Sequence, residues 1–284
     1  MPTIKSQDGT AIVVHHWPVA TPRAKVFILH GYGEHGQRYA ELAAALNRAG
    51  FAVIADDHRG HGQSGGTRGF IRSFADYLDD FDAVLAEGER LHPGVPRFVI
   101  GHSVGGLITL RHAVDRRAAH AGVVLSSPFL RLRLAVPAWK TSAGKFFSRV
   151  YPKLGLPSGL SGAKVARDAE IARTYDADRL NLKNATARWF TETMAAQQLA
   201  FAQADRFALP LLLIHGEADI VADPVGSAEI FPRLGSSDKT LELLAGAYHE
   251  IFSEPPADRG KVFARVIAWL EAHTGAQPGV QASA

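Results

Sequence analysis

The stretch from Phe98 to Gly106, FVIGHSVGG, constrains this chain more than any other. An apolar run typical of a buried strand comes first, and apolar residues then recur at helical spacing. Between them Ser103 stands in a Gly-x-Ser-x-Gly frame with Gly101 and Gly105. On a sharp strand-to-helix turn this frame lifts the serine above the sheet edge, and a Cβ atom at the flanking positions would clash. We therefore predict a nucleophile at Ser103, the alternative being a turn without chemistry.

Strand and helix patterns alternate along the first part of the chain. Asp8 and Gly9 lie between two short β-type runs, which indicates a hairpin. Buried strands are expected at residues 26–29, 51–55, 98–100, 123–125, 211–214 and 240–244, and helices at 39–46, 74–91, 104–114 and 262–270. This alternation predicts an α/β fold with a mostly parallel sheet and crossover helices.

The pattern changes between residues 129 and 207. No clear strand is present there, and helix-like fragments are interrupted by prolines and glycines. We expect residues 1–128 and 208–284 to form the core, and residues 129–207 to form an inserted helical cap or lid.

An acid and a base are expected beside the serine. A serine hydroxyl is a poor nucleophile until a base takes its proton, and the base needs a third group to orient its ring. Sites in open parallel sheets form at the carboxyl ends of strands, and Asp219 and His249 follow the last two predicted strands. We predict that they act with Ser103. Glu217 and Asp223 are competing acids, and His249 has an alternative role as a surface-loop histidine.

Acyl transfer also requires amide donors that face the developing oxyanion. One donor is expected to be the backbone N–H of Val104, which follows the serine. The other is expected in the glycine-rich loop after strand 26–29, at the N–H of Tyr32.

That glycine-rich loop has a second interpretation. Gly31, Gly33 and Gly36 match G-x-G-x-x-G between a strand and a helix, and Asp56 ends the next strand. This is the pattern of a dinucleotide-binding loop. A nucleotide-binding oxidoreductase would leave the elbow serine, the acid and the base unexplained, so we keep it as a remote alternative.

Composition excludes several classes of protein. Cysteine is absent, which excludes disulfides, a thiol nucleophile and cysteine-ligated metals. The net charge is +3, and no nucleic-acid module is recognisable. The first residues do not resemble a signal peptide, and no apolar run is long enough to span a bilayer. We expect a cytoplasmic enzyme without metal or cofactor that does not bind nucleic acid.

Several motifs together resemble the monoacylglycerol lipase and lysophospholipase family of serine α/β-hydrolases. The matching segments are HGYGEHGQRY at 30–39, DHRGHGQSGG at 57–66, GHSVGG at 101–106, HGEAD at 215–219 and YHE at 248–250. The resemblance implies a nucleophile at Ser103, an acid at Asp219 and a base at His249. It also implies that a monoacylglycerol is the favoured substrate, with a lysophospholipid or a small ester as the alternative.

The same resemblance places Glu34 and Arg38 near the glycerol head group, and the alternative for this pair is an ion pair that braces the loop. Two positions depart from the family pattern. Tyr32 replaces a residue that is often small, and Val104 replaces a common methionine. Both are expected to act through backbone donors, but Tyr32 is expected to narrow the pocket.

Residues 116–167 contain no Asp or Glu. Basic residues occur throughout this stretch, at Arg116, Arg117, Arg131, Arg133, Lys140, Lys145, Arg149, Lys153, Lys164 and Arg167. Apolar residues lie among them, at Phe129, Leu130, Leu132, Leu134, Val136, Trp139, Phe146, Phe147 and Tyr151. We hypothesise that the cap contacts an anionic membrane surface, where each basic residue contributes about 1 kcal/mol. The alternative is a solvated charged face over an ordinary core.

Overall fold

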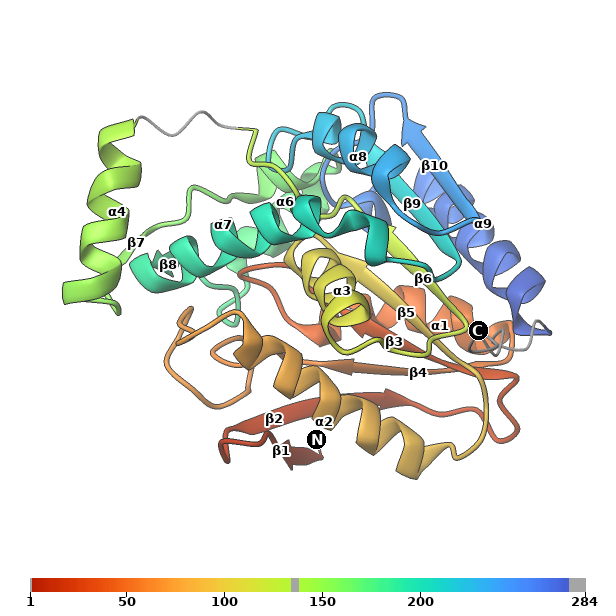
Figure 1. The fold of residues 1–284 in the computed structure, drawn as a ribbon. Helices are drawn as coiled ribbons and strands as arrows, with labels where there is room; N and C mark the ends of the chain where they lie inside the picture. The colour runs from red at the N-terminus through yellow and green to blue at the C-terminus, as the bar shows by residue number, and fades with distance from the viewer. Residues whose placement is uncertain (1, 134–137, 276–284) are drawn as a thin grey trace.

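An eight-stranded sheet forms the centre of the molecule, with strand order β1-β2-β4-β3-β5-β6-β9-β10. The computed structural model describes residues 2–133 and 138–275 (Figure 1). The strands are β1 (Thr3–Lys5), β2 (Ala11–Trp17), β3 (Ala24–Leu29), β4 (Phe51–Asp56), β5 (Arg97–His102), β6 (Gly122–Ser126), β9 (Leu211–Gly216) and β10 (Lys239–Leu244). Neighbours from β4 to β10 run parallel, whereas β1 and β2 are antiparallel additions. The predicted fold class, hairpin and parallel strands are confirmed.

Helices cover both faces of this sheet. They are α1 (Ala40–Arg48), α2 (Ala75–Leu91), α3 (Val104–Asp115), α8 (Pro224–Ile230) and α9 (Pro256–Thr274), with short 3₁₀ turns η1 (Gly36–Tyr39), η2 (Ala204–Arg206), η3 (Phe231–Arg233) and η4 (Ile251–Ser253). Phe27 points to the face covered by α2 and α3, whereas Val26 and Ile28 point to the face covered by α1 and α9. The central strands are therefore buried on both sides, and so they appear in the sequence as unbroken apolar runs.

A largely helical segment connects β6 to β9. It contains α4 (Ala138–Val150), β7 (Gly155–Pro157), α5 (Gly162–Val165), α6 (Ala169–Ala177), β8 (Asn184–Thr186) and α7 (Ala187–Ala202). The expectation that this segment has no strand was wrong, because β7 and β8 pair antiparallel. Strands of three residues are too short to show an alternating pattern. Within the described ranges, α7 packs Trp189 and Ala200 into the core beside α3, while α4 lies at the outer end of the molecule (Figure 1).

In residues 2–133 and 138–275, no helix combines the length and the apolar character that crossing a bilayer requires.

Candidate active site

Ser103 occupies the turn between β5 and α3, with φ 52° and ψ −116°. A positive φ is costly for a residue with a side chain, and it persists only where neighbouring contacts impose it. Here the Ser103 N–H donates to the Ser126 carbonyl (2.9 Å), and the Ser103 carbonyl accepts from Phe129 N–H (2.8 Å). A Cβ atom on Gly105 would lie 2.1 Å from the carbonyl oxygen of Leu29. The small flanking residue is therefore required by packing against β3, as the motif predicts.

Asp219 and His249 meet at the carboxyl ends of the adjacent strands β9 and β10. Nδ1 of His249 lies 2.6 Å from Oδ2 of Asp219, whose side chain is completely buried. The other carboxylate oxygen, Oδ1, accepts N–H bonds from Val221 (2.7 Å) and Ala222 (3.0 Å). His215 adds a ring nitrogen 3.1 Å from Oδ2. The carboxylate is thus fully engaged and holds the His249 ring in one orientation.

The surroundings of this pair favour a charged Asp219 carboxylate and a His249 ring that can gain and lose a proton. Burial raises the pKa of Asp219, but His249 and His215 outweigh this effect, so the pKa is lowered overall. For His249, burial lowers the pKa, and the Asp219 charge and hydrogen bond outweigh it, so the pKa is raised above 6.5. Because Nδ1 is bound to Asp219, Nε2 is the nitrogen left for a proton from Ser103.

Ser103 and His249 line one cavity of about 310 Å³. Most of the other lining residues are apolar, among them Val104, Phe129, Leu132, Leu156, Leu160, Trp189, Phe190 and Val221. The structure does not join the Ser103 hydroxyl and His249 by a direct hydrogen bond. In enzymes without substrate such catalytic bonds are often long, and they tighten when substrate binds. Among the described residues, no group of three or more histidines or carboxylates is placed to hold a metal ion.

The loop that carries Tyr32 packs closely against Ser103. A Cβ atom on Gly31 would lie 2.9 Å from Oε1 of Glu34 and 3.1 Å from Cβ of Ser103, so a larger residue would require these side chains to shift. Tyr32 and Val104 both line the cavity beside Ser103. The role of their backbone N–H groups as donors to the oxyanion of a bound ester stays a prediction.

The Tyr32 side chain extends from this loop to the segment between β6 and β9. Its ring lies 3.8 Å from that of Trp189 on α7, centroid to centroid, and its hydroxyl donates to the Asn184 carbonyl at 2.7 Å. The side chain thus occupies space between this loop and α7, and a narrower pocket than in relatives with a small residue here stays a prediction.

Glu34 and Arg38 form a buried ionic network with Glu250. Arg38 donates to Glu34 (2.7 Å) and makes two bonds to Glu250 (2.7 and 2.8 Å). The other oxygen of Glu34 accepts from Gly31 N–H (2.6 Å) and from the Tyr39 hydroxyl (2.9 Å). The network joins the loop that follows β3 to the loop that carries His249, which agrees with the ion-pair alternative. Contact with a substrate head group stays a prediction for both residues.

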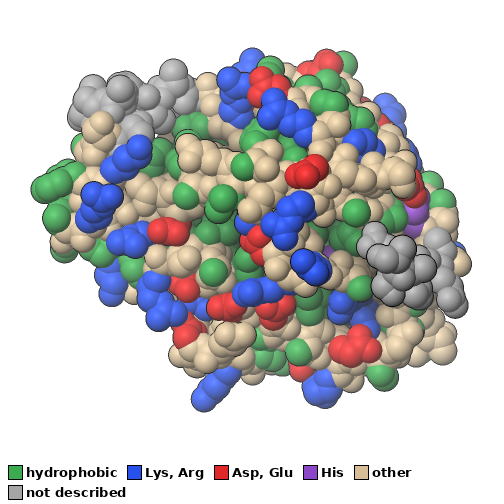
Figure 2. Space-filling view, viewed as in Figure 1, with side chains coloured by type: hydrophobic (Ala, Val, Ile, Leu, Met, Phe, Trp, Pro, Cys, Tyr) green, Lys and Arg blue, Asp and Glu red, His purple; other side chains and the backbone are tan. Residues whose placement is uncertain are grey.

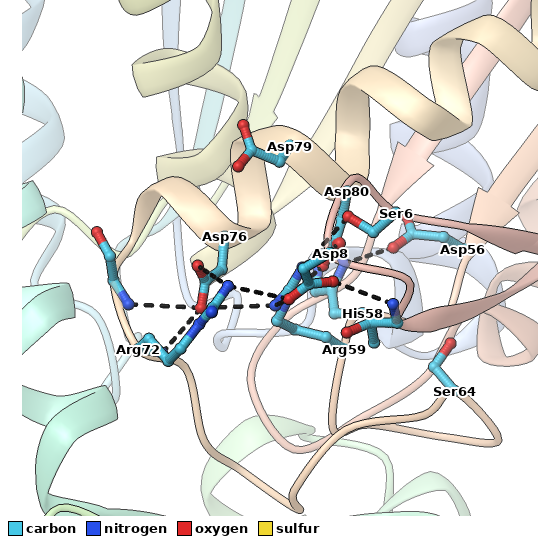
Figure 3. A network of polar contacts seen from close by, with 12 residues as sticks. Ser6, Asp8, Asp56, His58, Arg59, Ser64, Arg72, Asp76, Asp79 and Asp80 are labelled. Atoms are coloured by element: carbon cyan, nitrogen blue, oxygen red, sulfur yellow. Dashed lines mark hydrogen bonds and ion pairs between the residues drawn. The ribbon is translucent and has the colours of Figure 1, made fainter.

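A second polar network anchors the loop that follows β4 (Figure 3). Arg59 makes two bonds of 2.6 Å to Asp80 on α2, and it also contacts Asp8 (3.0 Å) and Asp76 (3.5 Å). Asp8 belongs to the turn between β1 and β2. Arg59 of the motif DHRGHGQSGG at 57–66 therefore attaches this loop to α2 and to the hairpin formed by β1 and β2.

Sequence reasoning missed several buried polar residues near the site. His215 and Glu250 adjoin predicted positions but had no predicted role, and His30 and His58 were not distinguished from other histidines. His30 stacks on His58 with ring centroids 3.8 Å apart. Their position directly after β3 and β4 was the signal that could have identified them.

The parallel sheet with its serine elbow, acid and histidine loops defines the α/β-hydrolase class. A family model described as Hydrolase_4, serine aminopeptidase S33, matches residues 20–256. The chain is 32% identical over 268 residues to a monoacylglycerol lipase of Mycolicibacterium smegmatis, covering 93% of this chain and 94% of that one. It is also 32% identical over 280 residues to human monoglyceride lipase, covering 96% and 91%.

Solved structures agree with these relatives. The monoacylglycerol lipase of Paleococcus ferrophilus superimposes with a TM-score of 0.84 at 34% identity, covering 92% of this chain and 99% of that one. The chain belongs to the monoacylglycerol lipase family of α/β-hydrolases. It is a serine hydrolase that cleaves carboxylic esters.

This result excludes the alternative of a dinucleotide-binding oxidoreductase, and the structure explains the misleading pattern. A Cβ atom on Gly36 would lie 2.6 Å from the Asp56 carbonyl oxygen, so this glycine serves close packing on β4. Oδ2 of Asp56 lies 2.7 Å from His58 Nδ1, and Asp56 is only 2% exposed, so burial keeps its carboxylate from a ribose.

Proposed function

We propose that this enzyme hydrolyses monoacylglycerols to glycerol and a free fatty acid through an acyl-serine intermediate at Ser103. The single observation that carries the proposal is the largely apolar cavity that reaches both Ser103 and His249. Such a cavity suits an acyl chain whose ester carbonyl lies at the serine. Relatives with the names monoacylglycerol lipase and monoglyceride lipase, matched over nearly their full lengths, support this substrate class.

In the first half of the reaction His249 removes the proton of the Ser103 hydroxyl, and the oxygen attacks the ester carbonyl. Asp219 stabilises the imidazolium and keeps the Nδ1 proton in place. The N–H groups of Val104 and Tyr32 bind the oxyanion; loss of one such donor typically lowers kcat by about 10²–10³. His249 then protonates the leaving alcohol as the bond from carbon to that oxygen breaks.

In the second half a water molecule gives its proton to His249 and attacks the acyl carbon. The tetrahedral intermediate collapses, the bond to the Ser103 oxygen breaks, and His249 returns the proton to that oxygen. The products are a fatty acid and the original enzyme.

A lysophospholipid is the second candidate substrate, because its acyl ester has the same chemistry and only the alcohol differs. The Bacillus subtilis protein with the name phospholipase YtpA is 30% identical over 257 residues, covering 90% of this chain and 98% of that one.

A substrate panel distinguishes the candidates. Monoacylglycerols of several chain lengths, lysophosphatidylcholine and nitrophenyl esters are compared by kcat/KM. We expect a monoacylglycerol to give the highest value, and we expect a fluorophosphonate to label Ser103. A higher value for lysophosphatidylcholine reverses the order of the two candidates. Absence of labelling contradicts the role of Ser103.

We also propose that residues 129–207 act as a cap that contacts anionic lipid. Large apolar side chains are exposed in and after α4, at Phe146 (61%), Val150 (60%), Tyr151 (61%) and Leu156 (53%). The exposed residues Lys145, Arg149 and Lys153 lie among them. Figure 2 shows hydrophobic and basic side chains mixed at the α4 end of the molecule. Leu134 and Val136, which belong to the same predicted surface, lie outside the described residues, as do the side chains of Trp139 and Lys140.

Vesicle binding tests this surface. We expect stronger binding to anionic than to neutral vesicles, and weaker binding at high salt because the attraction is screened. The double variant Phe146→Ser/Val150→Ser should bind less. Leu243→Ser removes an apolar side chain of 41% exposure on β10 and is the matched control. Equal binding to both kinds of vesicle, or none, contradicts the proposal.

A further inference from the structure

Two buried histidines lie directly behind the peptide that carries the Tyr32 N–H. The backbone N–H of His58 donates to Nε2 of His30 (2.9 Å), and Nδ1 of His30 lies 2.7 Å from the Gly31 carbonyl oxygen. A backbone N–H can only donate, so Nε2 of His30 carries a lone pair and Nδ1 carries the proton. The Nδ1–H group therefore donates to Gly31 O.

This bond determines where the Tyr32 N–H points. In a trans peptide the C=O and N–H groups point in opposite directions, so anchoring Gly31 O to His30 turns the Tyr32 N–H to the other side. The same loop is in contact with Ser103, as the 3.1 Å distance from a Cβ on Gly31 to Cβ of Ser103 demonstrates. His30 thus fixes the orientation of one expected oxyanion donor.

The ring of His58 faces an oxygen acceptor at each nitrogen. Nε2 lies 2.9 Å from the His30 carbonyl oxygen, which can only accept, so this nitrogen carries a proton. Nδ1 lies 2.7 Å from Oδ2 of Asp56. A neutral ring would present a lone pair to that carboxylate, whereas an imidazolium donates to both oxygens.

The surroundings place the positive charge on His58. Burial lowers the pKa of His58, but the charge and hydrogen bond of Asp56 outweigh it, and Asp80 on α2 adds to them, so the pKa is raised. Burial and the neighbouring His58 keep the pKa of His30 well below its usual value. The other groups that face the His58 ring are His61 from its own loop and Tyr77 from α2. Burial, together with His58, lowers the pKa of His61 to about 3, and Tyr77 is uncharged.

We propose that His58 is a buried imidazolium and a positioning residue that acts through His30 on the oxyanion hole. The backbone N–H of His58 holds the His30 ring, and the His58 ring holds the His30 carbonyl oxygen through its Nε2–H group. The His30 ring in turn donates to Gly31 O, and the same peptide carries the Tyr32 N–H that is expected to face the oxyanion. Each donor strengthens the next by polarising it. The positive charge also lies behind the loop where negative charge develops, which favours the transition state. The proposal rests on the roles given above to Tyr32 and Ser103.

Asp56→Asn tests the charge with little change of shape. The amide can donate to Nδ1 of His58, so the hydrogen bond stays while the ring becomes neutral. Asp82→Asn is the matched control, because Asp82 lies 2.8 Å from Nε2 of the buried His112 and the pair has no contact with the oxyanion loop. For nitrophenyl butyrate we expect Asp56→Asn to lower kcat about tenfold, less than the loss of a whole oxyanion donor, with KM unchanged. Equal kcat values for the two variants overturn the positioning role.

Nitrogen NMR of the histidine rings tests the protonation state without using activity. In the wild-type protein both ring nitrogens of His58 should stay protonated from about pH 5 to about pH 7, where an ordinary histidine with a pKa of about 6.5 loses its proton. The signals are assigned by their loss in His58→Gln. An unprotonated Nδ1 in this range overturns the proposal, even if Asp56→Asn fails to fold. The role of Ser103 is tested separately by Ser103→Ala, so failure of the proposed function can be distinguished from failure of this inference.

Discussion

The loops at the carboxyl ends of the strands and the segment that contains α4 are built in opposite ways. In the loops, charged side chains are buried and paired, as in the contacts of Arg38 with Glu34 and Glu250. In and after α4, large apolar side chains face solvent, with 61% exposure at both Phe146 and Tyr151. Buried polar pairs specify one geometry, because any displacement leaves a charge without its partner. Exposed apolar side chains impose no such condition on their positions.

This difference separates two requirements of an ester hydrolase. The reacting groups need fixed positions, because catalysis depends on donors that are oriented before the reaction. A surface that receives a lipid needs area and adaptability. α4 makes its polar contacts with α7 rather than with these loops: Ser148 lies 2.7 Å from the Thr191 hydroxyl, and Arg188 donates to the Ser148 carbonyl oxygen. We therefore expect substitutions in the loops to change activity and stability strongly, and substitutions on α4 to change mainly lipid binding.

The largest expected effect is that of Ser103→Ala. Without the nucleophile kcat should fall by a factor on the order of 10⁶, by analogy with serine-protease variants. Ser148→Ala on α4 is the control and should retain kcat. Nitrophenyl ester hydrolysis and fluorophosphonate labelling measure both variants, and retention of most activity in Ser103→Ala refutes the assignment.

The next effect concerns stability. Arg38→Ala leaves the buried carboxylates of Glu34 and Glu250 without their partner, so the free energy of unfolding should decrease by about 3–5 kcal/mol. Arg149→Ala removes an exposed arginine from α4 and should change it by less than about 0.5 kcal/mol. Urea unfolding of the two variants and the wild type measures these free energies. Equal free energies of unfolding for the two variants would contradict the stated difference between the loops and the segment that contains α4.

The pH dependence of activity gives a smaller effect. His249 accepts a proton only when it is neutral, and the Asp219 charge, which outweighs burial, raises its pKa above 6.5. We expect kcat/KM to fall as the pH decreases through a midpoint above 6.5. In Asp219→Asn the residual activity should show a lower midpoint, because the charge that raises the pKa is gone. An unchanged midpoint contradicts this assignment.

The smallest effect should come from Phe146→Ser. The side chain is 61% exposed, so its removal should change the free energy of unfolding by less than about 0.5 kcal/mol. Thermal unfolding and nitrophenyl ester hydrolysis should both match the wild type. A large loss of stability would mean that α4 is held by its apolar side chains in the same way as the core.

Much of the fold could be predicted because its central strands are buried on both faces. β3, β4, β5 and β6 give continuous apolar runs followed by glycine or polar residues, and these patterns are visible locally. β7 and β8 were missed because three residues give no period and their pairing joins segments far apart in the chain.

For the candidate site, the places of the catalytic residues in the fold could be predicted, but the contacts between their side chains and neighbouring side chains could not. Ser103, Asp219 and His249 follow strands, so the topology alone places them at one edge of the sheet. The contacts of His215 with Asp219 and of His58 with Asp56 were not predicted, because the positions of these residues after strands do not fix how their side chains are oriented once the chain is folded.

The sequence by itself determined the local backbone: a Gly-x-Ser-x-Gly frame at Ser103, after an apolar strand pattern and before a helical one, specifies the elbow. Only the tertiary structure decided which charges are paired and which nitrogen of a histidine carries its proton. These depend on distances and burial between segments such as those of Arg38 and Glu250, and a hydrogen bond or an ion pair exists only once folding has brought its two partners together.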